Sequence, residues 1–254
     1  MELFDSLFDD ETLIRLPEPA VPAQLARHIE LRAAHRSLLA TLVVPDRRLA
    51  DIARQIPPGL SVPVSVITSG GAGGLLALAR HEVPGVDIAA VEPALRDLDD
   101  LAGSAARVIS AASELRPEVI VFAELPYAPG WEAAVELIEA AGLYGKIATG
   151  HAEPRHDVER LSILIEADLP FKITSARNGD WLSLLLVIEA LVSGANLDDA
   201  AALMRLDDHR VGATISGWDA TTQSRVRRRV RRVGTTHVQE VINNLAMYGE
   251  LPAP

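Results

Sequence analysis

The sequence predicts an α/β protein built as a single (β/α)8 barrel with an N-terminal helical lead-in. Short apolar runs alternate with helical patterns from about Leu38 to the end of the chain. The first six runs lack the period-two alternation of a half-exposed sheet, as expected for parallel strands that are buried on both faces. Eight strand–helix repeats in 254 residues fit a closed barrel. We therefore expect one domain over residues 1–254, with the lead-in at 1–36 and the barrel at 37–254.

The lead-in and the first six repeats follow from apolar spacing and turn residues. Residues 1–22 end in a proline-rich stretch, and residues 23–36 have the apolar spacing of a helix. Asp46 is placed to cap the first barrel helix, and Gly142 to end a later one. The six apolar runs predict strands at 38–44, 62–68, 86–91, 119–124, 146–149 and 171–174.

The last two repeats are the weakest part of the barrel prediction. Helices are expected at 181–192 and 197–206, and after them strands seven and eight at 211–216 and 234–238. A helix at 221–232 separates these two strands, and a final helix covers 239–247. Because both strands are short and polar, an open doubly wound sheet with a helical C-terminal appendix is the alternative.

Composition narrows the function classes. The chain has no cysteine, which excludes disulfides, thiolate metal sites and a cysteine nucleophile. A net charge of −11 argues against general nucleic-acid binding. The acidic N-terminus lacks the pattern of a signal peptide, and the longest apolar run, 181–193, is too short to span a membrane. We expect a cytoplasmic protein that binds a small molecule without a membrane, nucleic acid or cofactor. A homo-oligomer is compatible with the sequence.

Polar residues follow the ends of several predicted strands, where the βα loops of either fold gather. They are Glu92, Glu124, Thr149, His151, Thr174, Arg177 and Asn178. These residues are the candidate substrate-binding and acid–base groups. The competing interpretation of any single acidic residue is a helix cap or a partner for an arginine.

The two lysines are the most specific signal, because the other 22 of the 24 basic residues are arginines. Strand alternation places Lys172 and Thr174 on the face opposite Phe171 and Ile173, which predicts that Lys172 points into the barrel. Burial would lower its pKa and leave a neutral amine able to attack a carbonyl. Lys146, on the adjacent strand, would be a second cation nearby and would also lower the pKa of Lys172. The alternative is a structural ion pair of Lys172 with Glu92 or Glu124.

Three further motifs favour structural interpretations. The glycines of residues 69–74 lack the spacing of a phosphate-binding loop and predict a tight turn. His151, Glu153, His156 and Asp157 are metal-ligand types, but they lack helical spacing and predict no metal site. The arginine run at 225–232 has valines at helical spacing, which predicts an amphipathic helix with a solvated face.

The strands with the two lysines resemble a family of uncharacterised actinobacterial proteins with a barrel-like pattern. Its members carry K-(I/L)-R-(T/C)-G-G, then P-F-K-A-T-A-G-L-H-H, H-G-F-L-N and G-S-C-S-F. The counterparts here begin at Lys146, Pro170, Gly179 and Gly234, and the resemblance covers most of the chain from Leu38.

This chain departs from that family at several polar positions. The family's arginine falls on Ala148, its paired histidines on Asn178 and Gly179, its asparagine on Ser183 and its cysteine on Thr236. An activity that uses these groups would be changed or absent. The motif around Lys172 also resembles the strand-six lysine motif of deoxyribose-phosphate aldolases, which form a Schiff base.

These observations predict an enzyme of the lyase or aldolase type acting on a small carbonyl compound. Lys172 would be the nucleophile, Lys146 its pKa modulator and Glu124 the acid–base group, with Thr174 or Arg177 as a substrate anchor. The alternative is a non-catalytic barrel that binds a ligand or a partner chain, diverged from an active relative.

Overall fold

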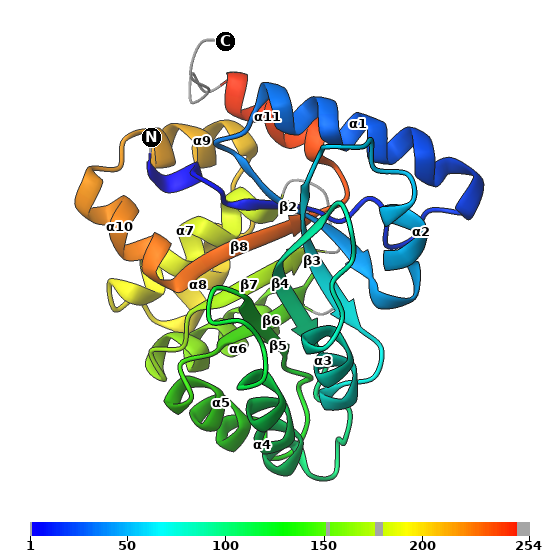
Figure 1. Ribbon diagram of the computed structural model, residues 1–254. Coiled ribbons are helices and arrows are strands. Elements are labelled where there is room, and N and C mark those ends of the chain that lie inside the picture. Colours follow the sequence, from blue (N-terminus) through cyan, green and yellow to red (C-terminus); the bar gives the residue numbers. More distant parts are fainter. Residues whose placement is uncertain (1, 151–152, 176–179, 248–254) are drawn as a thin grey trace.

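Eight parallel strands form a closed barrel in the order of the sequence, as the computed structural model of the protein shows (Figure 1). The structure describes residues 2–150, 153–175 and 180–247. Each strand pairs with the strands before and after it, and β1 pairs with both β2 and β8. The predicted (β/α)8 barrel is confirmed, and the β1–β8 pairing excludes the open sheet.

The six strands predicted from apolar runs occur where the sequence placed them, with ends shifted by no more than two residues. The strands are β1 Phe8–Asp10, β2 Leu39–Pro45, β3 Val62–Thr68, β4 Val86–Pro93, β5 Ile120–Glu124, β6 Tyr144–Thr149, β7 Phe171–Ser175 and β8 Val230–Thr235. Their buried aliphatic side chains join those of the surrounding helices in one hydrophobic core.

The first barrel strand lies inside the segment predicted as a helical lead-in. It is only three residues long and two of them are acidic, so nothing in its pattern indicates a buried strand. Its side chains are nevertheless fully buried. The Phe8 ring packs edge-on against Trp181 at 4.9 Å, and Asp10 accepts a hydrogen bond at 2.8 Å from the His28 ring, if Nδ1 carries the proton. Because β1 comes first, the lysine strands are the sixth and seventh of the barrel, one later than predicted.

The predicted seventh strand at 211–216 is wrong. This segment belongs to helix α9, Asp208–Ser216. Asp207 begins the helix, because its carboxylate accepts a hydrogen bond from the Arg210 backbone N–H. Val211 and Ile215 are four residues apart and both buried, which is a helical rather than a strand pattern.

The eighth strand was predicted too late in the chain. β8 takes residues that were assigned to the end of the arginine-rich helix, and that helix, α10 Ala220–Arg229, stops at Arg229. In β8, Val230 and Val233 are buried, and the two residues between them, Arg231 and Arg232, are half-buried. Because two of its residues are arginines, the sequence pattern of this segment did not indicate a strand.

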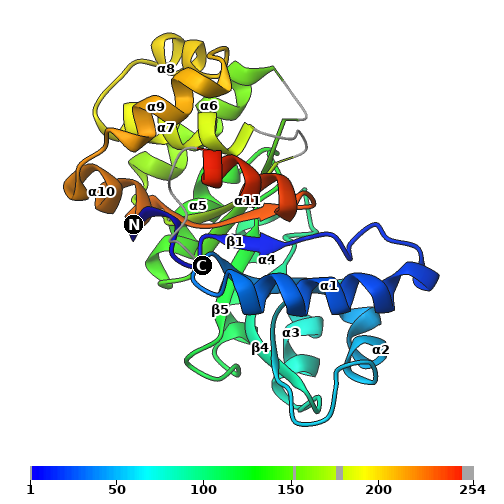
Figure 2. The same cartoon turned by 90° about the horizontal axis from the view of Figure 1, so that it is seen from above.

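The helices surround the barrel, and four of them lie between β7 and β8, where a regular barrel has one. Of these four, α8 packs against α6 and α7, and α9 packs against α7 (Figure 2). Among the described residues, none of the helices has both the length and the apolar character needed to cross a bilayer. The remaining helices are α1 Val21–Ala34, α2 Leu49–Ala53, α3 Ala72–Ala79, α4 Leu101–Ala112, α5 Trp131–Ala140, α6 Pro154–Glu166, α7 Asp180–Val192, α8 Leu197–Leu203 and α11 Val238–Met247, with short 3-10 turns η1 Glu2–Phe4, η2 Glu18–Ala20 and η3 Asp46–Arg48.

Candidate functional site

The two lysines lie directly opposite each other on neighbouring parallel strands. Lys146 of β6 is the register partner of Lys172 of β7, as we predicted. Their neighbours Ile147 and Ile173 belong to the hydrophobic core. Since side chains alternate along a strand, both lysines point to the other face, into the barrel.

Lys172 lies at the centre of a set of buried carboxylates. Its ammonium is 2.8 Å from Asp9 Oδ2, 2.8 Å from Glu92 Oε1 and 3.4 Å from Glu11 Oε1. The side chain is 0 % exposed. The carboxylates come from β1, from the residue that follows β1, and from β4, so the lysine joins three parts of the barrel wall.

Lys146 extends this set toward solvent. Its ammonium is 2.9 Å from Glu92 Oε2 and 3.0 Å from Glu124 Oε2. The Lys146 side chain is 7 % exposed, whereas that of Glu124, the last residue of β5, is 41 % exposed. We call the residues Asp9, Glu11, Glu92, Glu124, Lys146 and Lys172 the charged network. Its Lys146–Glu124 pair is the part that opens to solvent.

The charges in the network set the protonation of the lysines. Burial alone lowers the pKa of Lys172, but the Asp9 and Glu92 carboxylates outweigh it, and the pKa lies above its ordinary value. The pKa of Lys146 is also raised, because Glu92 and Glu124 outweigh its burial. The predicted lowering of the Lys172 pKa is therefore wrong. The structural ion pair with Glu92, which we set against it, is present.

Glu92 connects the two lysines. Burial raises the pKa of this carboxyl, but the ammonium groups of Lys146 and Lys172 outweigh burial and hold the pKa well below its usual range. The Ser65 hydroxyl donates a further hydrogen bond to Glu92 Oε1 at 2.6 Å. Glu92 is thus an ionised structural centre.

Several residues of the site were missed by sequence reasoning. Asp9 accepts a hydrogen bond from Thr41 Oγ1 at 2.6 Å and lies 3.6 Å from the Arg232 guanidinium. Asp9 and Glu11 belong to the segment read as a lead-in, and Arg232 to the predicted arginine-rich helix. Phe8 is followed by three consecutive acidic residues, Asp9, Asp10 and Glu11, so the local pattern did not indicate a buried strand.

The remaining predicted site residues have different positions. The Thr174 hydroxyl donates to Glu11 Oε1 at 3.3 Å and adjoins the network. Thr149 lies on the same face as Ile147, buried, with its hydroxyl 3.5 Å from the Thr174 carbonyl oxygen. His151, Arg177 and Asn178 lie outside the described residues.

The glycine-rich segment after β3 forms a tight turn. Asp46 Oδ2 accepts hydrogen bonds from the Ser69 backbone N–H at 2.6 Å and from its hydroxyl at 2.7 Å. Gly71 has φ +54° at the start of α3, a conformation that favours glycine. These contacts account for the glycines without a phosphate.

The arginine run is not a solvated face. Arg225 pairs with Glu189 at 3.2 Å, Arg229 pairs with Asp168, and Arg227 donates to backbone carbonyl oxygens. Within the run, Arg228 is the exposed arginine. The prediction of a solvated arginine face is therefore wrong, because most of these side chains fasten α10 to its neighbours.

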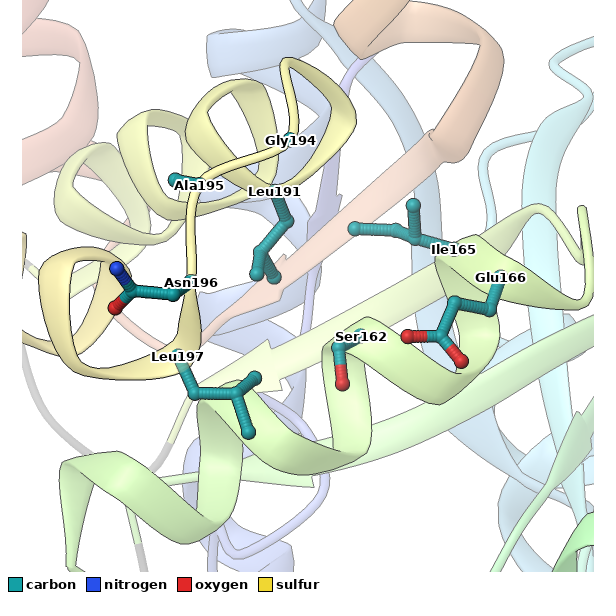
Figure 3. A pocket seen from close by; sticks show the side chains of 8 residues that line it. All are labelled: Ser162, Ile165, Glu166, Leu191, Gly194, Ala195, Asn196 and Leu197. Atoms are coloured by element: carbon teal, nitrogen blue, oxygen red, sulfur yellow. The ribbon is translucent and has the colours of Figure 1, made fainter.

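Two of the crevices that described residues line lie outside the barrel interior. One, of about 350 Å3, is bordered by α6 and the α7–α8 connection, with Ser162, Glu166, Leu191 and Asn196 in its lining (Figure 3). The other, of about 740 Å3, lies at the N-terminal end of β4 beside Arg80 and Arg116. Neither is lined by a residue of the charged network. Among the described residues, no cluster of three or more His, Asp or Glu side chains is arranged to hold a metal ion.

No protein-family model and no curated protein matches the chain. Among solved structures, the chain is similar to a variant of the carboxyl transferase domain of Rhizobium etli pyruvate carboxylase, solved with pyruvate. The sequence identity is 14 % and the TM-score 0.49, over 98 % of this chain and 50 % of that one. This chain therefore spans about half the length of that protein. A likeness at this level does not bear on function, and the barrel assignment stands on the strand pairing alone.

Proposed function

We propose that the protein is a small-molecule enzyme of the lyase type that acts on a carbonyl compound, with Lys146 and Glu124 in contact with the substrate. One observation carries this proposal. The Lys146–Glu124 pair combines a nearly buried ammonium with a half-exposed carboxylate 3.0 Å away, at the carboxyl end of β5. The carboxyl ends of the strands are where barrel enzymes hold their reactive groups.

The pair suits proton abstraction next to a carbonyl group. Lys146 is held as an ammonium, so it can donate a hydrogen bond to the carbonyl oxygen and stabilise negative charge there. Glu124 as a carboxylate can accept the proton from the neighbouring carbon. The C–H bond breaks, its electron pair forms a C=C bond, the carbonyl π pair moves onto the oxygen, and the proton rests on Glu124. The pair on the oxygen then re-forms the C=O bond, the bond from the next carbon to the leaving group breaks, and the leaving group takes the proton from Glu124, which completes a lyase reaction.

We also propose a Schiff-base route, but with Lys146 in place of Lys172 as the lysine that forms the imine. It requires a lysine that loses its proton, and Lys172 is surrounded by three carboxylates that hold its proton in place. Lys146 has partial access to solvent and a carboxylate, Glu124, that could take its proton. Lys146 is also the lysine of the sixth strand. If an imine forms, we expect it on Lys146.

Hydrogen–deuterium exchange of small carbonyl compounds in D2O tests the proposal by NMR. We expect exchange at the carbon next to the carbonyl group for at least one compound of a panel of aldehydes, ketones and 2-oxo acids. Glu124→Gln should lower the exchange rate by about 100-fold or more, since the general base is lost. Arg228→Gln, an amide in place of an exposed charge, should leave it unchanged. Exchange that persists at the wild-type rate in Glu124→Gln would contradict the proposal.

Borohydride reduction of the same mixtures separates the two routes. With only two lysines in the chain, the modified peptide identifies the amine by mass spectrometry. Reduction on Lys146 supports the imine route, and exchange without any reduction product supports acid–base chemistry alone. Reduction on Lys172 would overturn the reassignment.

The second candidate function is a barrel that binds a ligand without converting it. The complete burial of Lys172 in ion pairs favours this alternative, because such a network also serves as a purely structural core. A compound that raises the melting temperature, yet shows neither exchange nor reduction, would support it.

A further inference from the structure

In its contacts with the described residues, Glu11 is the least well paired of the three buried carboxylates of the charged network. Its Oε1 atom is 3.3 Å from the Thr174 hydroxyl and 3.4 Å from the Lys172 ammonium. Asp9 and Glu92, in contrast, each lie 2.8 Å from the same ammonium and accept a second short hydrogen bond from a hydroxyl group. Lys172 therefore shares its charge mainly with those two groups.

Among the described residues, the charged network contains one more carboxylate than it has cationic groups. Asp9, Glu11 and Glu92 are buried and face two lysines, Lys146 and Lys172. Adding the partly exposed Glu124 and Arg232 leaves the surplus at one, because it adds one charge of each sign. A buried charge without a partner is costly, and a carboxylate avoids this cost by taking up a proton.

We propose that Glu11 is a neutral carboxylic acid in the resting protein and holds the proton that balances the charged network. The two long contacts of Glu11 distinguish it from Asp9 and Glu92. The Glu11 carboxyl group also packs closely on the backbone of β8, since a Cβ atom on Gly234 would lie 1.9 Å from Glu11 Oε1.

The charges that face Glu11 agree with this assignment. Burial raises the pKa of its carboxyl, Lys172 and Lys146 lower it, and Glu92 and Asp9 raise it, with a net result above the ordinary value. These groups come from β7, β6, β4 and β1. The pKa of Glu92 moves in the opposite direction, because the ammonium groups of Lys146 and Lys172 lie closer to its carboxylate.

Resting on the proposed function, this inference assigns Glu11 a regulatory role at the same site. As pH rises through the Glu11 pKa, the proton leaves and a new negative charge forms 3.4 Å from Lys172. The network then carries a net negative charge, which opposes the negative charge that the proposed reaction builds on the substrate oxygen near Lys146. Glu11 acts through the network as a positioning residue rather than on the substrate.

Infrared spectroscopy of the ligand-free protein tests the protonation state without reference to activity. A neutral carboxylic acid has a carbonyl stretching band that carboxylates lack. We expect this band at neutral pH in the wild-type protein and its loss in Glu11→Gln, with the band retained in Glu189→Gln, which removes a carboxylate outside the charged network. Its amplitude should fall as pH rises. A wild-type spectrum without the band at neutral pH, or a band that persists in Glu11→Gln, overturns the proposal.

Thermal unfolding as a function of pH gives a second, independent readout. Because the folded-state pKa of Glu11 is raised from 4.5, the folded protein binds more protons than the unfolded chain above about pH 4.5. The Glu11 contribution to stability is then present below pH 4.5 and is lost as pH rises through the folded pKa. Glu11→Gln lacks this loss, so its melting temperature should rise relative to wild type with increasing pH.

Glu92→Gln is the matched control, with the opposite sign. The Glu92 pKa is lowered, so its contribution is present above the unfolded value of 4.5 and is lost toward acid pH. Glu92→Gln should therefore melt below wild type at neutral pH, by a margin that shrinks as pH falls. If Glu11→Gln melts below wild type at neutral pH in the same way, or fails to fold, Glu11 is ionised and the proposal is wrong. If these results hold but no substrate is found, only the proposed function fails.

Discussion

At the scale of single residues, Lys172 is held by charges of opposite sign rather than by hydration. Its ammonium is surrounded by Asp9, Glu92 and Glu11, and none of its atoms is exposed. Replacing such a group with an apolar side chain leaves carboxylates buried without a counter-charge, which is more costly than never having buried them.

We predict that Lys172→Met destabilises the protein by about 3–5 kcal/mol, because Asp9 and Glu92 lose their shared partner. Urea unfolding at neutral pH measures the change. Arg228→Met, which removes a charge from an exposed position, should stay within about 0.5 kcal/mol of wild type. A Lys172→Met protein as stable as wild type would show that the carboxylates find protons or other partners at little cost.

The residue-scale prediction from sequence succeeded where it depended on local geometry. Alternation along the strand was enough to point Lys172 and Lys146 inward. The sign of the Lys172 pKa shift was wrong because it depends on Asp9, which is 163 residues away in the sequence. Desolvation can be foreseen from an apolar strand, whereas the identity of the nearest charges requires the fold.

At the scale of elements, α10 shows that charge density does not indicate exposure. The Arg227 guanidinium donates to the carbonyl oxygens of Val230 at 2.7 Å, Arg231 at 3.2 Å and Asp5 at 3.0 Å. Burial, together with the neighbouring Arg232 and Arg231, lowers the pKa of Arg227 to about 10. This one side chain connects the end of α10, the start of β8 and the N-terminal segment.

Arg227→Met should therefore destabilise the protein by about 1–3 kcal/mol, because three carbonyl oxygens, two of them part-buried, lose their charged donor. Chemical denaturation of Arg227→Met and Arg228→Glu compares the free energies of unfolding of two variants in the same helix. Arg228→Glu should change the free energy of unfolding by no more than about 0.5 kcal/mol. Equal effects of the two substitutions would mean that the carbonyl contacts of Arg227 contribute nothing.

The elements that the sequence located correctly are those with long apolar runs. β2 to β7 consist mainly of apolar residues, with single charged residues such as Glu92, Lys146 and Lys172 among them, so their runs are easily recognised. β1 and β8 line the interior with charged residues, Asp9 and Arg232, whose partners lie on other strands. A strand whose buried face is polar has no apolar pattern to find, and in this barrel those two strands adjoin each other at the closure.

At the scale of the whole molecule, the closure of the barrel depends on a strand of three residues. β1 pairs with β2 on one side and with β8 on the other. It also brings Asp9, and Glu11 just beyond it, to Lys172. Without β1 and the residue that follows it, the sheet has two open edges and the network loses two of its three buried carboxylates.

We predict that a chain beginning at Leu38 does not fold cooperatively, because both the sheet and the counter-charges of Lys172 are incomplete. Circular dichroism during urea titration would show a broad transition in place of a single sharp one. Addition of a synthetic peptide of residues 1–37 should restore a sharper transition, and the same peptide with Asp9→Asn should restore it less. A truncated chain that unfolds as sharply as the full chain would show that residues 1–37 are an appendage.

The pairing of β1 with β8 also has a consequence for synthesis of the chain on the ribosome. β8 begins at Val230, so β1 and its buried acidic groups must wait for nearly the whole protein to be made before the barrel can close. Contacts between such distant segments slow folding, because the loop that joins them must be ordered first. During this interval Asp9 and Asp10 keep β1 hydrated, and the acidic character that hid this strand from sequence analysis protects its unpaired edges from association with other nascent chains.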